Sequence, residues 1–133
     1  DDRITALNDF AGRANTTAII NGSTSSNVTN TEDYAAGFCN RYSRTNANGK
    51  GMTAGKWWLP SMGEMAMIWA NFDKINYALS KISSATLLQA NWYWTSTQYS
   101  ANYAWYLGLG VGNMSNFWKF NQGRVRPVSA FLN

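Results

Sequence analysis

The sequence contains no histidine, one cysteine and two prolines among its 133 residues. Histidine is the commonest general base and the commonest metal ligand, so its absence argues against catalysis and against a metal site. An internal disulfide is excluded because a bridge needs two cysteines. Cys39 follows Phe38 in an apolar helical pattern, and no cluster of cations lies beside it to activate the thiol. We therefore expect a protein that is not an enzyme and has no cofactor.

Acidic residues are missing from the last 60 residues of the chain, 74–133. All seven carboxylates lie at or before Asp73, whereas residues 74–133 hold five of the eleven basic residues. Residues 74–133 therefore carry +5 and residues 1–73 carry −1, which sum to the formal net charge of +4. An anionic partner such as an acidic sugar would suit this asymmetry, although five separate solvated charges are the simpler explanation. The basic residues are not clustered and no nucleic-acid motif is present, so we expect no nucleic acid.

Long hydrophobic runs are also missing. No apolar run approaches the roughly 20 residues that a membrane helix needs, so we expect no membrane insertion. The first ten residues include neither Met nor the apolar region of a signal peptide. The length suits one domain over residues 1–133. We expect this domain to be the C-terminal part of a longer protein.

Helical periodicity dominates the first two thirds of the chain. A short amphipathic pattern in 3–20 predicts a brief helix or turn. Apolar residues at helical spacing predict a helix over 32–44, with Thr31 as its N-cap. Ser61 and Glu64 have the spacing of a capping box, so a further helix should begin there. Its buried stripe would be Met65, Ile68, Trp69 and Phe72, and a second helical run from Asp73 would turn Ile75, Leu79 and Ile82 inward.

Aromatic and apolar residues alternate with other residues after Leu88. Four such runs, centred on 92–95, 104–109, 117–120 and 124–130, are separated by Gly, Asn and Ser. This spacing predicts four short antiparallel strands, the last of them at an edge because it contains Pro127. Residues 46–55 form a Gly-rich loop without the phosphate-loop pattern. The fold class predicted is α+β, with two or three helices packed on short antiparallel strands.

Several motifs resemble one protein family. They are LPSMGE at 59–64, YWTSTQYS at 93–100, AWYL at 104–107 and RVRPVSAF at 124–131. The resemblance is to the C-type-lectin-like fold shared by the C-terminal domain of collagen-like bacterial adhesins and the variable proteins of diversity-generating retroelements. It runs from about residue 4 to residue 131, and it implies that the C-terminal strands and loops form the ligand face. In the retroelement branch, adenine mutagenesis changes Asn codons in the segment before the VRPV motif.

Codon arithmetic on this segment gives a list of candidate positions. Most residues in it are either Asn or types that an Asn codon reaches by changes at its adenines, while Trp118 would be framework or come from a Lys codon. Aromatic anchors set among small polar residues are typical of recognition surfaces. Trp57, Trp58, Trp94 and Trp105 are expected in the core. The ligand-binding residues predicted are Tyr93, Tyr103, Tyr106, Gly108, Gly110, Val111, Asn113, Ser115, Asn116, Phe117, Trp118, Phe120, Asn121 and Gly123, with Gln122 as a further polar contact.

The resemblance implies a binding function without catalysis. The predicted function is that of a hypervariable receptor-binding domain at the tip of a phage tail fibre, in contact with a bacterial surface protein or glycan. The alternatives are a secreted or surface adhesin of a bacterium and a structural cap of a fibre. Each of these would be extracellular, and a homotrimeric parent protein would add avidity to a weak single site. Formylglycine-generating oxidases share the fold but need paired cysteines, and this chain has only Cys39.

Overall fold

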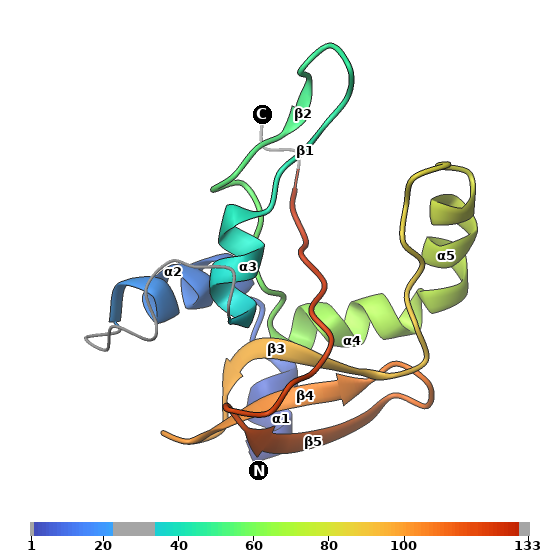
Figure 1. The fold of residues 1–133 in the computed structure, drawn as a ribbon. Coiled ribbons are helices and arrows are strands. Elements are labelled where there is room, and N and C mark those ends of the chain that lie inside the picture. Colours follow the sequence, from blue (N-terminus) through green and yellow to red (C-terminus); the bar gives the residue numbers. More distant parts are fainter. Residues whose placement is uncertain (1, 23–33, 131–133) are drawn as a thin grey trace.

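A three-stranded antiparallel sheet and the helix α4 packed on it form the centre of the fold (Figure 1). The computed structural model describes residues 2–22 and 34–130, which contain five helices and two small antiparallel sheets. The predicted α+β class is thereby confirmed. The elements are α1 (Asp2–Leu7), α2 (Gly12–Gly22), α3 (Ala35–Arg41), β1 (Arg44–Thr45), β2 (Gly51–Met52), α4 (Met62–Ala70), α5 (Phe72–Ser80), β3 (Trp92–Gln98), β4 (Tyr103–Gly108) and β5 (Asn113–Trp118).

The order β3-β4-β5 makes the main sheet a simple meander. Residues that face each other across two antiparallel strands point to the same side of the sheet. Tyr93 pairs with Leu107, which pairs with Met114, so these three share one side. Trp94 and its partner Tyr106 lie on the opposite side. We call the first side the α4 face and the second the α3 face, after the helices beside them.

The main core lies between the α4 face and the helices. Met62 and Met65 of α4 are fully buried there against Leu107 and Trp105 of the sheet. Ala6 of α1 closes the cluster from the side. Of the stripe predicted for α4, Trp69 lies exposed instead, because only one side of this helix contacts the sheet. Ile82, predicted to point inward, also lies exposed, since α5 ends at Ser80 and the chain turns away.

The capping box at the start of α4 is confirmed. The Ser61 hydroxyl accepts a hydrogen bond from the Glu64 amide at 3.4 Å, and the Glu64 carboxylate accepts one from the Ser61 amide at 2.9 Å. Both bonds satisfy amides that the first turn of a helix leaves without partners. Ser61 also donates from its hydroxyl to the backbone carbonyl of Asp9 at 2.6 Å. The same residues thus start α4 and fix it to the loop between α1 and α2.

The α3 face is covered by helix α3 and by the C-terminal segment. Cys39 of α3 is fully buried against Leu59 and Trp94, as expected for a structural thiol, and burial raises its pKa to about 12. The fourth predicted strand reduces to isolated bridges, in which Val128 exchanges two backbone hydrogen bonds with Trp58. Pro127 has no amide hydrogen to donate, which helps to explain why no continuous strand forms there.

The structure corrects three further expectations. Residues 3–20 form parts of two helices rather than one brief helix, and their apolar Ile4 and Phe10 are exposed while Ala6 and Thr16 are buried. Helix α3 spans only Ala35–Arg41, within the predicted 32–44, and the predicted cap at Thr31 lies outside the described residues. The Gly-rich stretch 46–55 contains β2, which pairs with β1 just before the stretch in a hairpin that projects away from the main sheet (Figure 1). None of the described helices is long and apolar enough to cross a membrane.

Candidate functional site

The carboxylates nearest the centre of the fold are engaged in framework hydrogen bonds. Asp9 accepts from the Thr97 hydroxyl and from the Asn15 side chain, both at 2.8 Å, and from the Ala11 amide at 2.9 Å. Glu64 accepts from the amides of Ser61 and Gly12. Across the described part of the chain, no three His, Cys, Asp or Glu side chains gather as metal ligands would. This region therefore braces the fold, and Glu64 serves as the predicted capping residue.

The predicted ligand-binding residues of β4 and β5 divide between the two faces of the sheet. Tyr103, Asn116 and Trp118 belong to the α4 face, by their pairing with each other and with Trp105. The α3 face receives the alternate set, which consists of Tyr106, Gly108, Asn113, Ser115 and Phe117. Both sets are accessible near β5, because β5 is the edge strand and within the described residues only β4 pairs with it.

A row of rings crosses the α3 face from β3 to β5. We call Trp92, Trp94, Tyr106 and Phe117 the ring row. Trp92 stacks on Tyr106 with ring centroids 4.2 Å apart, and Tyr106 stacks on Phe117 at 5.6 Å. Exposure increases along the row, from the buried Trp94 through the half-buried Tyr106 to Phe117, which is 41% exposed. The row therefore joins the core to an accessible ring at the edge of the sheet.

A second group of rings lies at the end of the sheet where β5 finishes. We call Tyr99, Tyr103, Trp118 and Phe120 the end cluster. Successive ring centroids from Tyr103 to Trp118 and from Trp118 to Phe120 are 4.6 Å and 6.0 Å apart. Trp118 is 43% exposed and Phe120 81% exposed. Tyr99 connects the cluster to the buried Trp105 by an edge-on contact at 5.2 Å.

Lys119 lies in the sequence between two rings of the end cluster, Trp118 and Phe120. Its amide donates to the Asn102 carbonyl and its ammonium donates to the Ala101 carbonyl, each at 3.0 Å. Partial burial lowers the pKa of this ammonium, because a desolvated cation loses its proton more readily. These bonds close the turn between β3 and β4 against the end of β5. The end cluster is thus fixed by backbone hydrogen bonds as well as by ring contacts.

The turn between β4 and β5 holds two more of the predicted residues, Gly110 and Val111. Leu109 before them is buried and donates its amide to the Asn91 carbonyl at 2.9 Å. Gly112 has a φ of +73°, and a side chain there would strike the ring of Trp69. The turn is therefore anchored at both ends, while Val111 projects into solvent between them. Trp69 belongs to this neighbourhood although the sequence pattern placed it in the core.

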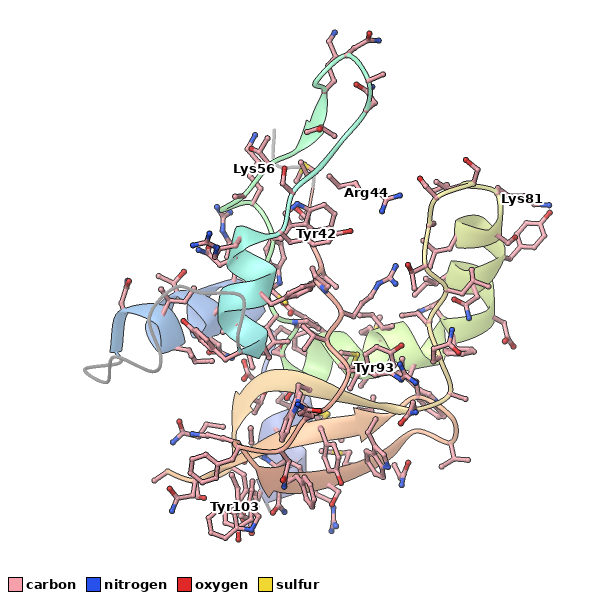
Figure 2. The ribbon with its side chains drawn as sticks, viewed as in Figure 1. Tyr42, Arg44, Lys56, Lys81, Tyr93 and Tyr103 are labelled. Atoms are coloured by element: carbon pink, nitrogen blue, oxygen red, sulfur yellow. The ribbon has the colours of Figure 1, made fainter. Side chains whose placement is uncertain are left out.

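Two predicted ligand-binding residues lie in the framework. Tyr93 is only 4% exposed, belongs to the main core, and accepts a hydrogen bond from the Gln89 amide through its hydroxyl. Figure 2 shows Tyr93 between α4 and the sheet, whereas Tyr103 lies at the outer end of the sheet. Gly123 packs so closely on Trp94 that a Cβ would lie 2.6 Å from the indole nitrogen. Neither position offers a side chain to a ligand, so neither belongs to the candidate contact surface.

Sequence reasoning missed two residues of this region. Tyr99 is exposed and contacts both Trp105 and Tyr103, and its place directly after a strand rich in aromatics was the available signal. Trp92 begins a predicted strand but is not among the predicted ligand-binding residues, although its ring is half-exposed on the α3 face. Asn121 lies exposed beyond β5, and Ser115 and Asn116 are half-buried within it.

Comparison with known protein families, with curated proteins and with solved structures gives no match.

Proposed function

We propose that this chain is a receptor-binding domain whose contact surface consists of the exposed rings of β5 and its two ends. The observation that carries the proposal is the exposure of Phe117, Trp118 and Phe120, three large rings within four consecutive residues. Exposed apolar patches in soluble proteins commonly mark interaction sites. Aromatic side chains also dominate the binding energy of protein interfaces. Phe10 beside Asp9 is exposed too, but it is a single ring rather than three within four consecutive residues.

The rings are held in place before any ligand arrives. Trp118 rests on Tyr103, and Phe117 rests on Tyr106, which itself rests on the half-buried Trp92. A side chain that is already ordered loses little conformational entropy when it binds. Rigid rings beside Ser and Asn side chains therefore supply contact area and hydrogen bonding at low entropic cost. This arrangement supports binding rather than catalysis as the role of the segment.

We further propose that the chain is a variable protein of a diversity-generating retroelement with a C-type-lectin-like fold. The motifs from LPSMGE to RVRPVSAF suggest this family, and the exposure pattern supports diversification. Val111, Phe117 and Phe120 point away from the core, and substitutions at such sites usually change stability by no more than about 0.5 kcal/mol. A protein whose binding residues vary widely needs this tolerance. Asn113, Ser115, Asn116 and Asn121 would supply further variable contacts.

In this proposal the parent protein is extracellular and displays the domain at the tip of a phage tail fibre. Its partner is a protein or glycan on a bacterial surface, and three copies on a fibre would strengthen a weak single contact. A bacterial adhesin that displays the same surface is the second candidate. The third is a fibre cap in which the rings are buried between subunits, a role that exposed rings also suit.

The DNA beside the gene tests the retroelement assignment. We expect a near-copy of the segment that encodes 91–131, differing from it mainly where the copy has adenine. The differences should fall at codons of exposed residues such as Val111 and Phe120, and they should spare Tyr93 and Gly123. The absence of such a copy would contradict diversification and leave a fixed adhesin. A signal peptide or cell-wall anchor in the full gene would exclude the tail fibre.

Matched phenylalanine variants test the binding surface. Phe120→Ser removes an exposed ring of the end cluster, and Phe10→Ser removes one that is 59% exposed in the loop between α1 and α2. Binding of the purified domain to a panel of intact bacterial strains is the measurement. We expect Phe120→Ser to weaken binding at least about tenfold, while Phe10→Ser leaves it unchanged. Equal losses in both variants would refute the proposed surface.

The fibre-cap alternative makes a different prediction about assembly. If the rings are buried between subunits, Phe120→Asp should convert an oligomer of the wild-type domain into a monomer. Sedimentation velocity measures this directly. We expect the oligomeric state to be the same in Phe120→Asp and in the wild type. Dissociation of the variant would favour the cap over the receptor-binding surface.

A further inference from the structure

We infer that the α3 face contains a subsite for one neutral sugar ring, beside the turn between β4 and β5. This inference rests on the proposed binding function and names the ligand chemistry of one part of that surface. A shallow depression of about 310 Å³ lies there, with Gly108 as its floor and Trp92 and Asn113 on opposite sides. Pockets for small ligands span roughly 300–1,000 Å³, so this one suits a single small ring.

The floor of the depression is rigid and has no side chain. Gly108 is buried in β4 between its strand neighbours Trp92 and Asn113. A Cβ at Gly108 would collide with the Asn113 amide and lie 3.5 Å from the Trp92 ring. The Gly108 carbonyl accepts from the Gly112 amide at 2.8 Å, which ties the floor to the anchored turn. Glycine at this position therefore leaves the room that the Asn113 amide occupies beside the Trp92 ring.

Trp92 supplies an aromatic wall that is already fixed. Tyr106 stacks on its indole at 4.2 Å, and the backbone of Trp92 pairs with Gly108. The face of an aromatic ring is the negative part of its quadrupole and attracts C–H groups, and a pyranose ring presents a face of C–H groups. A wall of this kind orients a sugar ring without needing charge.

Two side-chain amides complete the site. Among the described residues, no protein group hydrogen bonds to the Asn113 side chain, and the Asn91 side chain uses only its oxygen, which accepts from the Trp92 amide at 2.8 Å. An amide group offers two donors and an acceptor, which suits adjacent sugar hydroxyls. An apolar side chain from a protein would displace water from these amides without replacing its hydrogen bonds. The amides therefore favour a sugar over a hydrocarbon ring.

Charge further narrows the ligand class. The described residues that line the depression carry no charged side chain. Asp73 and Lys74 line a separate depression of about 500 Å³ on the other side of Ala90 and Gly110. A sulfate or carboxylate in the first depression would lose its hydration without gaining a counter-charge. The ligand we infer is thus an uncharged pyranose, either free or at the end of a surface glycan.

An NMR titration of the ¹⁵N-labelled domain tests the subsite. The probes are the methyl pyranosides of glucose, mannose, galactose and N-acetylglucosamine, each added alone. We expect at least one to give saturable shifts at millimolar concentration, concentrated at the Trp92 indole N–H, the Asn91 and Asn113 side-chain amides and the Gly110 amide. The absence of saturable shifts with all four sugars would overturn the inference.

Two variants test whether the sugar-induced shifts arise from binding in the depression. A glycine variant elsewhere in the chain controls for the substitution itself. Gly108→Ala should weaken sugar binding about tenfold or more, because its methyl group takes the place of the Asn113 amide. Gly108 has no positive φ, so alanine adds no backbone strain there. Asn113→Ala should weaken binding similarly while leaving the dispersed spectrum intact. Gly22→Ala at the end of α2, where a Cβ meets nothing within 4 Å, should bind as the wild type does.

The outcomes separate this inference from the proposed function. N-acetyl-tyrosinamide serves as a probe for a protein side chain, and shifts at the same residues with this probe but with no sugar would overturn the inference. If sugars do not bind but Phe120→Ser still abolishes adhesion to bacteria, the binding function stands without the subsite. If sugars bind at Trp92 while Phe120→Ser has no effect on adhesion, the subsite stands and the proposed contact surface fails.

Discussion

The loop network at the start of α4 and the edge strand β5 use opposite kinds of side chain. Around α4, the carboxylates of Asp9 and Glu64 are hydrogen bonded to amides, hydroxyls and the Asn15 side chain. Along β5, large rings reach solvent and rest on half-buried rings behind them. Satisfied polar groups fix the backbone, whereas exposed rings are available for contacts. The fold thus separates the residues that specify it from those that can change.

The largest expected difference in stability is between variants of two tryptophans in the main sheet. Trp105 is 4% exposed in the main core, whereas Trp118 projects from the edge strand. Trp105→Ala should lower the free energy of unfolding by about 3–5 kcal/mol, because it leaves a large cavity. Trp118→Ala should lower it by about 1 kcal/mol or less. Urea denaturation followed by circular dichroism measures both free energies. Equal losses of stability would remove the distinction between the core and the exposed rings of β5.

The polar network is tested by a pair of aspartates. Asp9→Ala deprives the Thr97 hydroxyl, the Asn15 side chain and the Ala11 amide of their acceptor. We expect a loss of about 1.5–3 kcal/mol in the free energy of unfolding, measured in urea. Asp73→Ala, at an exposed position in the first turn of α5, should lose about 0.3–1 kcal/mol. A loss at Asp9 no greater than at Asp73 would show that the network does not brace the fold.

The third prediction compares two glycines, Gly110 and Gly112, of the turn between β4 and β5. Gly112→Ala should destabilise the domain by about 1–3 kcal/mol, because its φ is positive and its methyl group would meet the Trp69 ring. Gly110→Ala should change stability by about 0.5 kcal/mol or less, since its Cβ makes an ordinary 3.5 Å contact with Ala90. Thermal unfolding curves would distinguish them. Similar melting temperatures for both variants would contradict the anchored turn.

The smallest effect concerns the buried thiol of Cys39, whose pKa is raised to about 12 by desolvation. The unfolded thiol ionises near its ordinary value of 9.0, so unfolding releases a proton between that pH and about 12. The contribution of Cys39 to stability is therefore complete below pH 9 and falls as pH rises. Between pH 8 and 10 the wild type should lose about 1 kcal/mol more than Cys39→Ala does. Parallel losses in urea at the two pH values would argue against deep burial.

Local patterns in the sequence predicted the α+β class, the capping box and the first two strands of the main sheet, whereas the third, predicted over 117–120, lies earlier, at Asn113–Trp118. Each depends on neighbouring residues, such as the three-residue spacing of Ser61 and Glu64 or the alternation along β4. The hairpin of β1 and β2 was missed, because strands of two residues are too short to show alternation. The C-terminal segment alternates like a strand, but only isolated bridges form there.

The candidate surface was harder to predict because both sides of this sheet carry aromatic residues. Alternation tells which residues share a face, but it does not tell which face a helix covers. Tyr93 and Tyr103 look alike in sequence, yet the first lies under α4 and the second at the free end of the sheet (Figure 2). Gly123 looked like a variable position, although its close approach to Trp94 requires a residue without a side chain.

The sequence by itself determined where α4 begins, which residues alternate, and that the chain has no histidine, no second cysteine and no carboxylate after Asp73. These properties follow from composition and from contacts within a few residues. Only the tertiary structure decided that the candidate residues divide between two faces, that β5 is the edge strand and that Gly108 forms the floor of a depression. The physical reason is that burial depends on what packs against a residue, and those partners come from distant parts of the chain.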